Sequence, residues 1–222
     1  MLVVAADTSG KDGSIALARG NPDGSCELIE VVPLAGGTFS AQLVPQIAAL
    51  LAKHSFHKED IEAFAVASGP GSFTGLRVGL AAVKALAEVL SKPVAAVSRL
   101  EALASASKSQ GNVIAALDAG RGEVYAGQYE VRQRARLISE RLLTMEEFLA
   151  EAAGHVVITS DNSLADSSRA AGLHVEQVES PPSDAIARLG WHKILAKDTV
   201  RPEDLEANYL RRSDAEIFSK GR

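Results

Sequence analysis

A glycine-rich run between an apolar segment and a long apolar helix constrains this chain more than any other feature. The run reads ASGPGSFTGLRVGL over residues 67–80. Glycine at a strand-to-helix turn permits positive φ and close backbone approach, and the free N–H groups at a helix start favour an anion. The spacing of Gly69, Gly71 and Gly75 is one residue too long for a dinucleotide fingerprint, and Leu76-Arg77 stands where a P-loop needs Lys and Ser or Thr. The favoured interpretation is a tight turn that lets the helix pack closely on its neighbours, with a phosphate cradle as the alternative.

The predicted helix over residues 74–90 has two apolar sides. At helical spacing its polar residues Arg77, Lys84 and Glu88 gather in one narrow stripe. One apolar side carries Leu76, Leu80, Val83, Ala87 and Leu90, and the other carries Gly75, Val78, Gly79, Ala82, Ala85, Leu86 and Val89. A helix on the outside of a sheet needs only one such side, so either another helix of this chain or a partner chain must cover the second.

Composition narrows the class of protein. The 222 residues, 46% of them hydrophobic, suffice for one large domain or two small ones. The formal charge of −5 argues against a protein that binds nucleic acid through its own electrostatic field. The densest basic cluster, at Arg132, Arg134, Arg136 and Arg141, is interleaved with acidic residues and is typical of a solvated surface. The single cysteine, Cys26, fits a reducing compartment, and the N-terminal residues show no targeting pattern. We therefore expect a soluble, cytoplasmic protein.

The second half of the chain repeats the pattern of the first. Residues 3–17 and 113–127 are each an apolar strand, an aspartate (Asp7 or Asp118), a glycine-bearing turn and a returning strand. The first half is predicted to have strands at 2–6, 14–19, 26–32, 63–67 and 94–97 and helices at 38–53, 74–90 and 99–107. The second half echoes it, with a further strand at 136–142, a helix at 144–153, a strand at 156–159 and a helix at 163–171. We predict an α/β protein of two βββαβα halves, 1–100 and 101–222, with a C-terminal helix that can pack back on the first half.

This duplicated architecture is similar to that of actin, Hsp70 and the sugar kinases, the ribonuclease H-like class. Five runs of sequence, spread over nearly the whole chain, resemble the TsaB (YeaZ-type) family of bacterial proteins. They are Ala5–Ser9, Ser68–Gly79, Val97–Leu103, Leu117–Tyr125 and Pro202–Leu210. The resemblance implies a subunit that is not itself an enzyme. It acts with the catalytic subunit TsaD and the ATPase TsaE to transfer threonylcarbamoyl from threonylcarbamoyl-AMP to N6 of the adenosine beside the anticodon in tRNA.

The resemblance also implies partners and a docking surface. The helices near 40–53 and 74–90 are expected to bind TsaD or, in its absence, a second copy of the chain as a homodimer. The residues expected at this interface are Leu43, Ile47, Leu51, Leu76, Gly79, Leu80, Ala82, Val83 and Leu86. The chain departs from the family at residues 38–42, Thr-Phe-Ser-Ala-Gln, where the family commonly has a start like His-Ser-Glu. No cofactor is expected on this chain alone, whereas the complex uses ATP and a metal held by the catalytic partner.

A nucleotide site is the main alternative. By analogy with nucleotide-binding relatives, Asp7, Gly10 and Asp118 could face a phosphate-bound magnesium, which would fit a self-sufficient kinase or ATPase of the same fold. The competing interpretation is that each aspartate accepts backbone N–H groups in its own turn. A metallopeptidase is a third possibility, but the chain has no His-x-x-x-His pair, and His54 and His57 are expected at the surface. Arg121, Arg132, Arg134, Arg136, Arg211 and Arg212 are candidates for a composite tRNA site.

Overall fold

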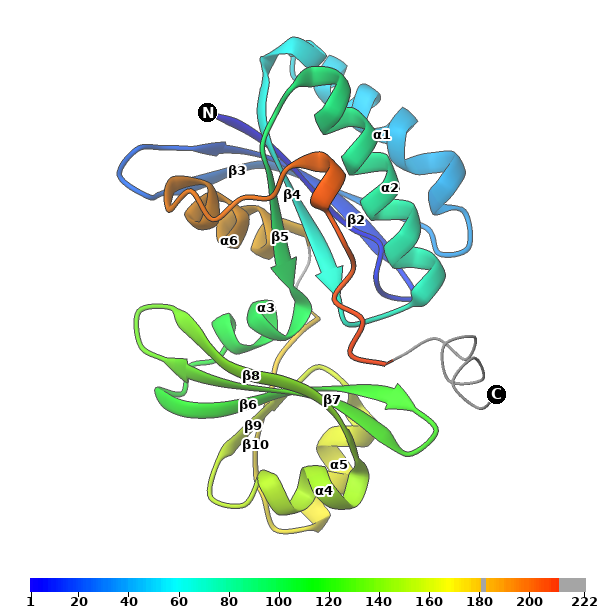
Figure 1. The fold of residues 1–222 in the computed structure, drawn as a ribbon. Coiled ribbons are helices and arrows are strands. Elements are labelled where there is room, and N and C mark those ends of the chain that lie inside the picture. Colours follow the sequence, from blue (N-terminus) through cyan, green and yellow to red (C-terminus); the bar gives the residue numbers. More distant parts are fainter. Residues whose placement is uncertain (181–182, 212–222) are drawn as a thin grey trace. The chain divides into compact units, whose positions relative to one another are not determined.

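The chain divides into two units in the computed structural model, which describes residues 1–180 and 183–211 (Figure 1). The first unit comprises residues 1–102 and 183–207, and the second comprises 103–180 and 208–211. Residues 183–207 therefore belong with the first unit although they follow the second one in sequence. Among the described residues, no helix has both the length and the apolar character needed to cross a bilayer.

The first unit is built on a mixed five-stranded sheet in the order β3-β2-β1-β4-β5. Its strands are β1 (Leu2–Asp7), β2 (Gly13–Gly20), β3 (Cys26–Leu34), β4 (Ile61–Gly69) and β5 (Val94–Ser98). The first three strands form an antiparallel meander, while β4 and β5 run parallel to β1. A central strand of this kind is covered on both faces, which explains why β1 is buried at every position.

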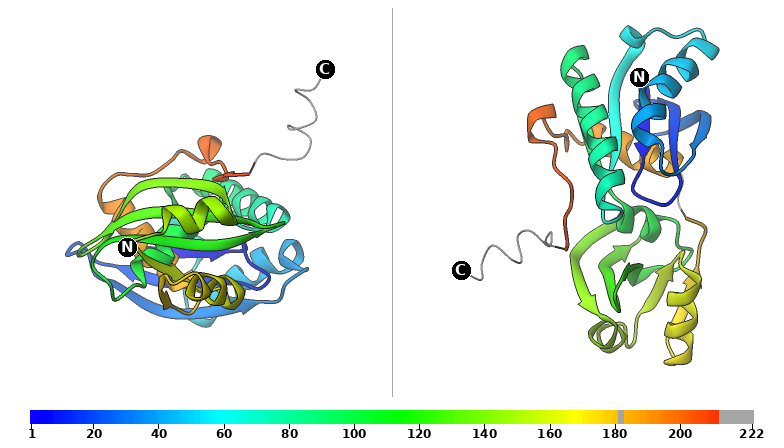
Figure 2. Two further views of the ribbon diagram at one scale, coloured as in Figure 1. Left: turned by 90° about the horizontal axis from the view of Figure 1, so that it is seen from below. Right: turned by 90° about the vertical axis from the view of Figure 1, so that its right-hand side faces the viewer.

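Helices cover both faces of this first sheet (Figure 1, Figure 2). On one face lie α1 (Phe39–Lys53) and α2 (Phe73–Leu90), whose core side chains pack with Val4 of β1. On the other face Ile186, Ala187 and Trp191 of α6 (Ser183–Leu195) share an apolar cluster with Val3. Three short elements complete this part of the chain: η1 (Lys58–Asp60), η2 (Pro202–Asp204) and α3 (Arg99–Ser105), which directly follows β5 and ends in the second unit.

The second unit repeats the sheet of the first. Its strands are β6 (Gly111–Gly120), β7 (Glu123–Val131), β8 (Ala135–Thr144), β9 (Val156–Thr159) and β10 (His174–Gln177). Their order, β10-β9-β6-β7-β8, is the order of the first sheet read from the other end. The helices α4 (Met145–Glu151) and α5 (Asn162–Ala170) share one apolar cluster with this sheet. The predicted α/β fold with two βββαβα halves is thus confirmed.

Candidate docking surface on the first unit

A groove of about 450 Å³ runs between α1 and α2. It is lined by Ser40, Leu43, Val44, Thr74, Arg77, Val78, Ala81 and Ala82. Val44 in this lining is 45% exposed, and Val89 near the end of α2, which is 79% exposed, extends the apolar surface beyond the groove. The groove is therefore largely apolar, with the cation of Arg77 and the hydroxyls of Ser40 and Thr74 among its lining.

Most of the residues predicted for a partner interface contribute to the core of the first unit, and two of them, Leu43 and Ala82, also line the groove. Seven of the nine are buried: Leu43, Ile47, Leu51, Leu76, Gly79, Leu80 and Val83. Only Ala82 and Leu86 are half-buried. The surface left for a partner consists of the groove and the outer ridge of α2, formed by Ala81, Ala85 and Val89. A charge at Leu80 or a bulky side chain at Gly79 would disrupt the core, so such changes cannot test docking.

The glycine-rich run serves close packing between α2 and the turn that follows β1. An ideal Cβ on Gly71 would lie 2.4 Å from the carbonyl oxygen of Ser9, and one on Gly75 would lie 2.0 Å from that of Thr8. The backbone N–H of Ser72 donates to the Ser9 carbonyl at 2.7 Å, and the Thr8 hydroxyl donates to the Gly75 carbonyl at 2.7 Å. Thr8 and Ser9 thus fill the space beside these two glycines. The structure agrees with the packing interpretation.

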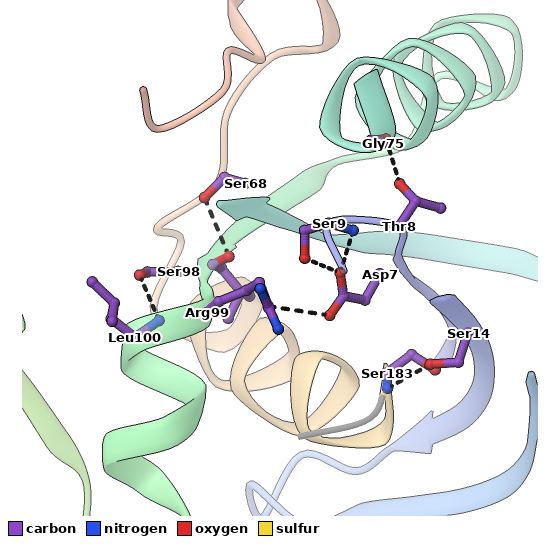
Figure 3. A network of polar contacts seen from close by, with 11 residues as sticks. Asp7, Thr8, Ser9, Ser14, Ser68, Gly75, Ser98, Arg99, Leu100 and Ser183 are labelled. Carbon is purple, nitrogen blue, oxygen red and sulfur yellow. Dashed lines mark hydrogen bonds and ion pairs between the residues drawn. The ribbon is translucent and has the colours of Figure 1, made fainter. Parts of the chain in front are cut away.

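Asp7 has its partners within the first unit (Figure 3). One carboxylate oxygen accepts the backbone N–H of Ser9 at 2.8 Å and also the Ser9 hydroxyl. The other oxygen lies 3.8 Å from Nε of Arg99. This buried carboxylate thus faces a guanidinium and holds the turn that follows β1. Gly10 lies close to Asp12, whose carbonyl oxygen would be 2.9 Å from a Cβ on that glycine.

Asp118 occupies the equivalent position in the second unit. Its carboxylate accepts the backbone N–H of Gly120 at 2.8 Å, and its own N–H donates to the Asp161 carboxylate at 2.7 Å. Both predicted aspartates therefore hold backbone groups in their own turns, as one of the two interpretations expected. Among the described residues, no group of three His, Cys, Asp or Glu side chains is placed to hold a metal ion.

The candidate arginines do not form one patch in the second unit. Arg121 lies in the turn before β7, and Arg211 contacts the Gly120 carbonyl and Glu123 at the same end. Arg132, directly after β7, and Arg136, near the start of β8, both donate to the Glu130 carboxylate at the other end of β7. The nine residues of β7, a length of about 30 Å, separate the two groups. Arg134 lies in the turn between β7 and β8, and Arg212 lies outside the described residues.

Sequence reasoning missed two contacts beside the docking surface. Arg99 pairs with Asp7, and Lys84 of α2 donates to the carbonyl oxygen of Glu203 in η2 at 2.7 Å. Leu205, after η2, is buried in the same apolar cluster as α2. The only sequence signal for the second contact was the polar stripe of the helix, which contains Lys84.

Comparisons with known proteins bear on the whole chain. The family model described as TsaD, tRNA N6-adenosine threonylcarbamoyltransferase, matches residues 31–176. The chain is 27% identical to the Bacillus subtilis protein named tRNA threonylcarbamoyladenosine biosynthesis protein TsaB, over 92% of this chain and 85% of that protein. It is 29% identical to the Haemophilus influenzae protein of the same name, over 95% of this chain and 94% of that protein. The solved structure of YeaZ from Pseudomonas aeruginosa is similar with a TM-score of 0.77 and 26% identity, covering 94% of this chain and 99% of that one.

Proposed function

We propose that this chain, which belongs to the family described as TsaD, tRNA N6-adenosine threonylcarbamoyltransferase, takes part in making threonylcarbamoyladenosine in tRNA. It is similar over most of its length to proteins named TsaB. Its role is that of a non-catalytic subunit. It docks the catalytic subunit TsaD, and together with TsaE they transfer threonylcarbamoyl to N6 of the adenosine beside the anticodon.

The observation that carries this proposal is the surface formed by α1 and α2. An apolar groove beside a ridge of small residues, Ala81 and Ala85, lets the helices of another protein approach closely. Exposed apolar side chains such as Val89 lose contact with water only when a partner covers them. In the absence of TsaD the same surface can pair with a second copy of the chain.

The chemistry of the described residues supports a role without catalysis. Asp7 is engaged by Ser9 and Arg99, and the helix start that could hold a phosphate is packed against Thr8 and Ser9. ATP and the metal ion of the reaction therefore belong, in this proposal, to the partner proteins. The chain's own contribution is to bind and orient its catalytic partner.

The test is reconstitution of tRNA modification. TsaD, TsaE, ATP, threonine, bicarbonate and the adenylate-forming enzyme are incubated with tRNA, with and without this chain, and modified adenosine is quantified. We expect modification only when the chain is present, and none from the chain alone. Equal modification without it would overturn the proposal. Saturable ATP binding by the isolated chain in calorimetry, lost on Asp7→Ala, would favour a self-sufficient kinase or ATPase instead.

A matched pair of variants tests the surface itself. Ala81→Glu places a charge in the groove, whereas Ala170→Glu makes the same change at an exposed position on α5 of the second unit. We expect Ala81→Glu to abolish the complex with TsaD in gel filtration and Ala170→Glu to leave it intact, with both variants folded by circular dichroism. An intact complex with Ala81→Glu would place docking elsewhere on the chain.

A further inference from the structure

A largely buried ion pair lies in the same polar network as the start of α2 (Figure 3). Asp7 ends β1, and Arg99 is the first residue of α3. Nε of Arg99 lies 3.8 Å from the Asp7 carboxylate, and the two side chains are only 15% and 11% exposed. At such low exposure water screens the two opposite charges weakly, so Arg99 adds an electrostatic contact to the hydrogen bonds that Asp7 accepts from Ser9.

The ion pair is connected to α2 through the turn that follows β1. The carboxylate of Asp7 accepts both the N–H and the hydroxyl of Ser9, which fixes the conformation of that turn. The Ser9 carbonyl then accepts the N–H of Ser72, the residue that caps α2. Because Gly71 brings the backbone into contact with Ser9, little space is left for the turn to move without moving the helix start.

We propose that Arg99, acting through Asp7 and Ser9, is a positioning residue for the docking surface. This inference rests on the proposed function. Thr74, Arg77 and Val78 lie in the first two turns of α2 and line the groove. A helix start held in place presents them ready for a partner, so less ordering is needed on binding. Arg99 itself is not part of the groove lining.

The test compares Arg99→Gln with Arg188→Gln in the full chain. Arg188 forms an ion pair on α6, on the other face of the first sheet, with Asp184. Two quantities are measured for each variant: the dissociation constant for TsaD by calorimetry, and hydrogen exchange of the backbone amides of residues 72–76. We expect Arg99→Gln to weaken binding about tenfold, within the range for residues that act through packing, and to speed exchange at the helix start. Arg188→Gln should change neither quantity.

The conservative variant separates positioning from a general loss of structure. Arg99→Lys keeps a cation near Asp7 and should recover most of the affinity and of the amide protection. Wild-type affinity and wild-type exchange in a folded Arg99→Gln variant would overturn the inference. If Arg99→Gln does not fold, the same two measurements on Asp7→Asn, which keeps an acceptor for Ser9 but not the charge, decide the question.

The two proposals fail in different ways. If the wild-type chain does not bind TsaD, the proposed function fails, while the exchange measurement still shows whether Arg99 holds the start of α2. If the wild-type chain binds TsaD and Arg99→Gln binds equally well with unchanged exchange, only the positioning role fails.

Discussion

Lys84 of α2 donates a hydrogen bond to the carbonyl oxygen of Glu203, a residue 119 positions further along the chain. A single side chain on the candidate docking helix thus holds the segment after α6 against that helix. Nearby, Val200 bonds the backbone of Val94 in β5, and Leu205 is buried in the core of the first unit. The segment is therefore part of the structure that supports α2.

Replacing Lys84 by methionine should loosen this segment. Methionine keeps an apolar side chain of similar length but cannot donate to the Glu203 carbonyl. We expect faster hydrogen exchange at residues 203–205, with little change in the strands of the first sheet. Lys58→Met, at an exposed position in η1, is the control and should leave exchange there unchanged. Equal exchange in wild type and Lys84→Met would mean that the Val200 hydrogen bond and the burial of Leu205 hold the segment without Lys84.

Alanine at either of two glycines of α2 should destabilise the protein, but through contact with different atoms of Thr8. A Cβ on Gly75 would meet the backbone oxygen of Thr8 at 2.0 Å, whereas one on Gly79 would meet the Thr8 hydroxyl at 2.3 Å. We expect each substitution to lower the free energy of unfolding by about 1–3 kcal/mol, because overpacking outweighs the better helix propensity of alanine. Urea denaturation measures the change.

A second substitution distinguishes the two glycines. Thr8→Ala removes the hydroxyl that Gly79→Ala would meet, so the double variant should be more stable than the sum of the single effects predicts. The same change cannot relieve Gly75→Ala, because the obstacle there is backbone. Ala85→Ser, at an exposed position on α2, controls for helix propensity. Additive effects in the Gly79 cycle would contradict the packing described for Thr8.

The acid sensitivity of the second unit should depend on Glu176. Burial alone would raise the pKa of this carboxyl, but hydrogen bonds from Lys108, Ser107 and Ser109 outweigh it and leave the pKa below its ordinary value of 4.5. The unfolded chain therefore binds the proton more readily than the folded one. The resulting stabilisation is complete above the unfolded pKa and is lost as the pH falls through the folded pKa.

Glu176→Gln should consequently destabilise the protein at neutral pH, and the difference from wild type should shrink below about pH 4. Denaturation followed by circular dichroism at neutral and acidic pH measures this difference. Glu179→Gln, the same substitution at an exposed position three residues further on, is the control. A difference that stays constant with pH would show that the carboxylate form of Glu176 is not what secures residues 107–109.

The single tryptophan offers a probe of the first unit. Trp191 of α6 is 1% exposed, its ring lies against Gly20, and its indole N–H donates to the Asn21 carbonyl at 3.0 Å. Trp191→Ala should cost roughly 3–5 kcal/mol of unfolding free energy, as for other large buried aromatic residues. Wild-type tryptophan emission should shift to longer wavelength only when the first unit unfolds. If Trp191→Ala lowers the free energy of unfolding by less than about 1 kcal/mol, α6 contributes little to the core.

Much of the fold could be predicted from local pattern. The apolar run that ends at Asp7 and its echo at Asp118 indicated two similar halves, and the glycine spacing indicated close packing of the following helix. These signals are local, because strand periodicity, turn residues and glycine requirements are each set within a few residues. Leu80 and Val83 illustrate the limit. Helical periodicity placed them on an apolar side of the helix, but it could not tell a side that meets the sheet from one that meets a partner.

Contacts between distant segments could not be predicted in this way. Nothing near Arg99 in the sequence indicates Asp7 as its partner, and nothing near Lys84 indicates Glu203. Likewise, the sequence allowed a C-terminal helix to pack on the first half, but it did not indicate that Trp191 would lie against Gly20. Such pairings are properties of the assembled sheet, where strands far apart in sequence become neighbours.

The return of residues 183–207 to the first unit has a consequence for synthesis on the ribosome. Residues 1–102 emerge first, but the sheet face formed by Val3, Ala5 and Ala65 is covered only when α6 emerges, after the whole of the second sheet. The second sheet and its two helices, by contrast, leave the ribosome as one uninterrupted stretch. The nascent first sheet therefore carries an uncovered apolar face while about eighty further residues are added, a period of several seconds at the usual rate of elongation.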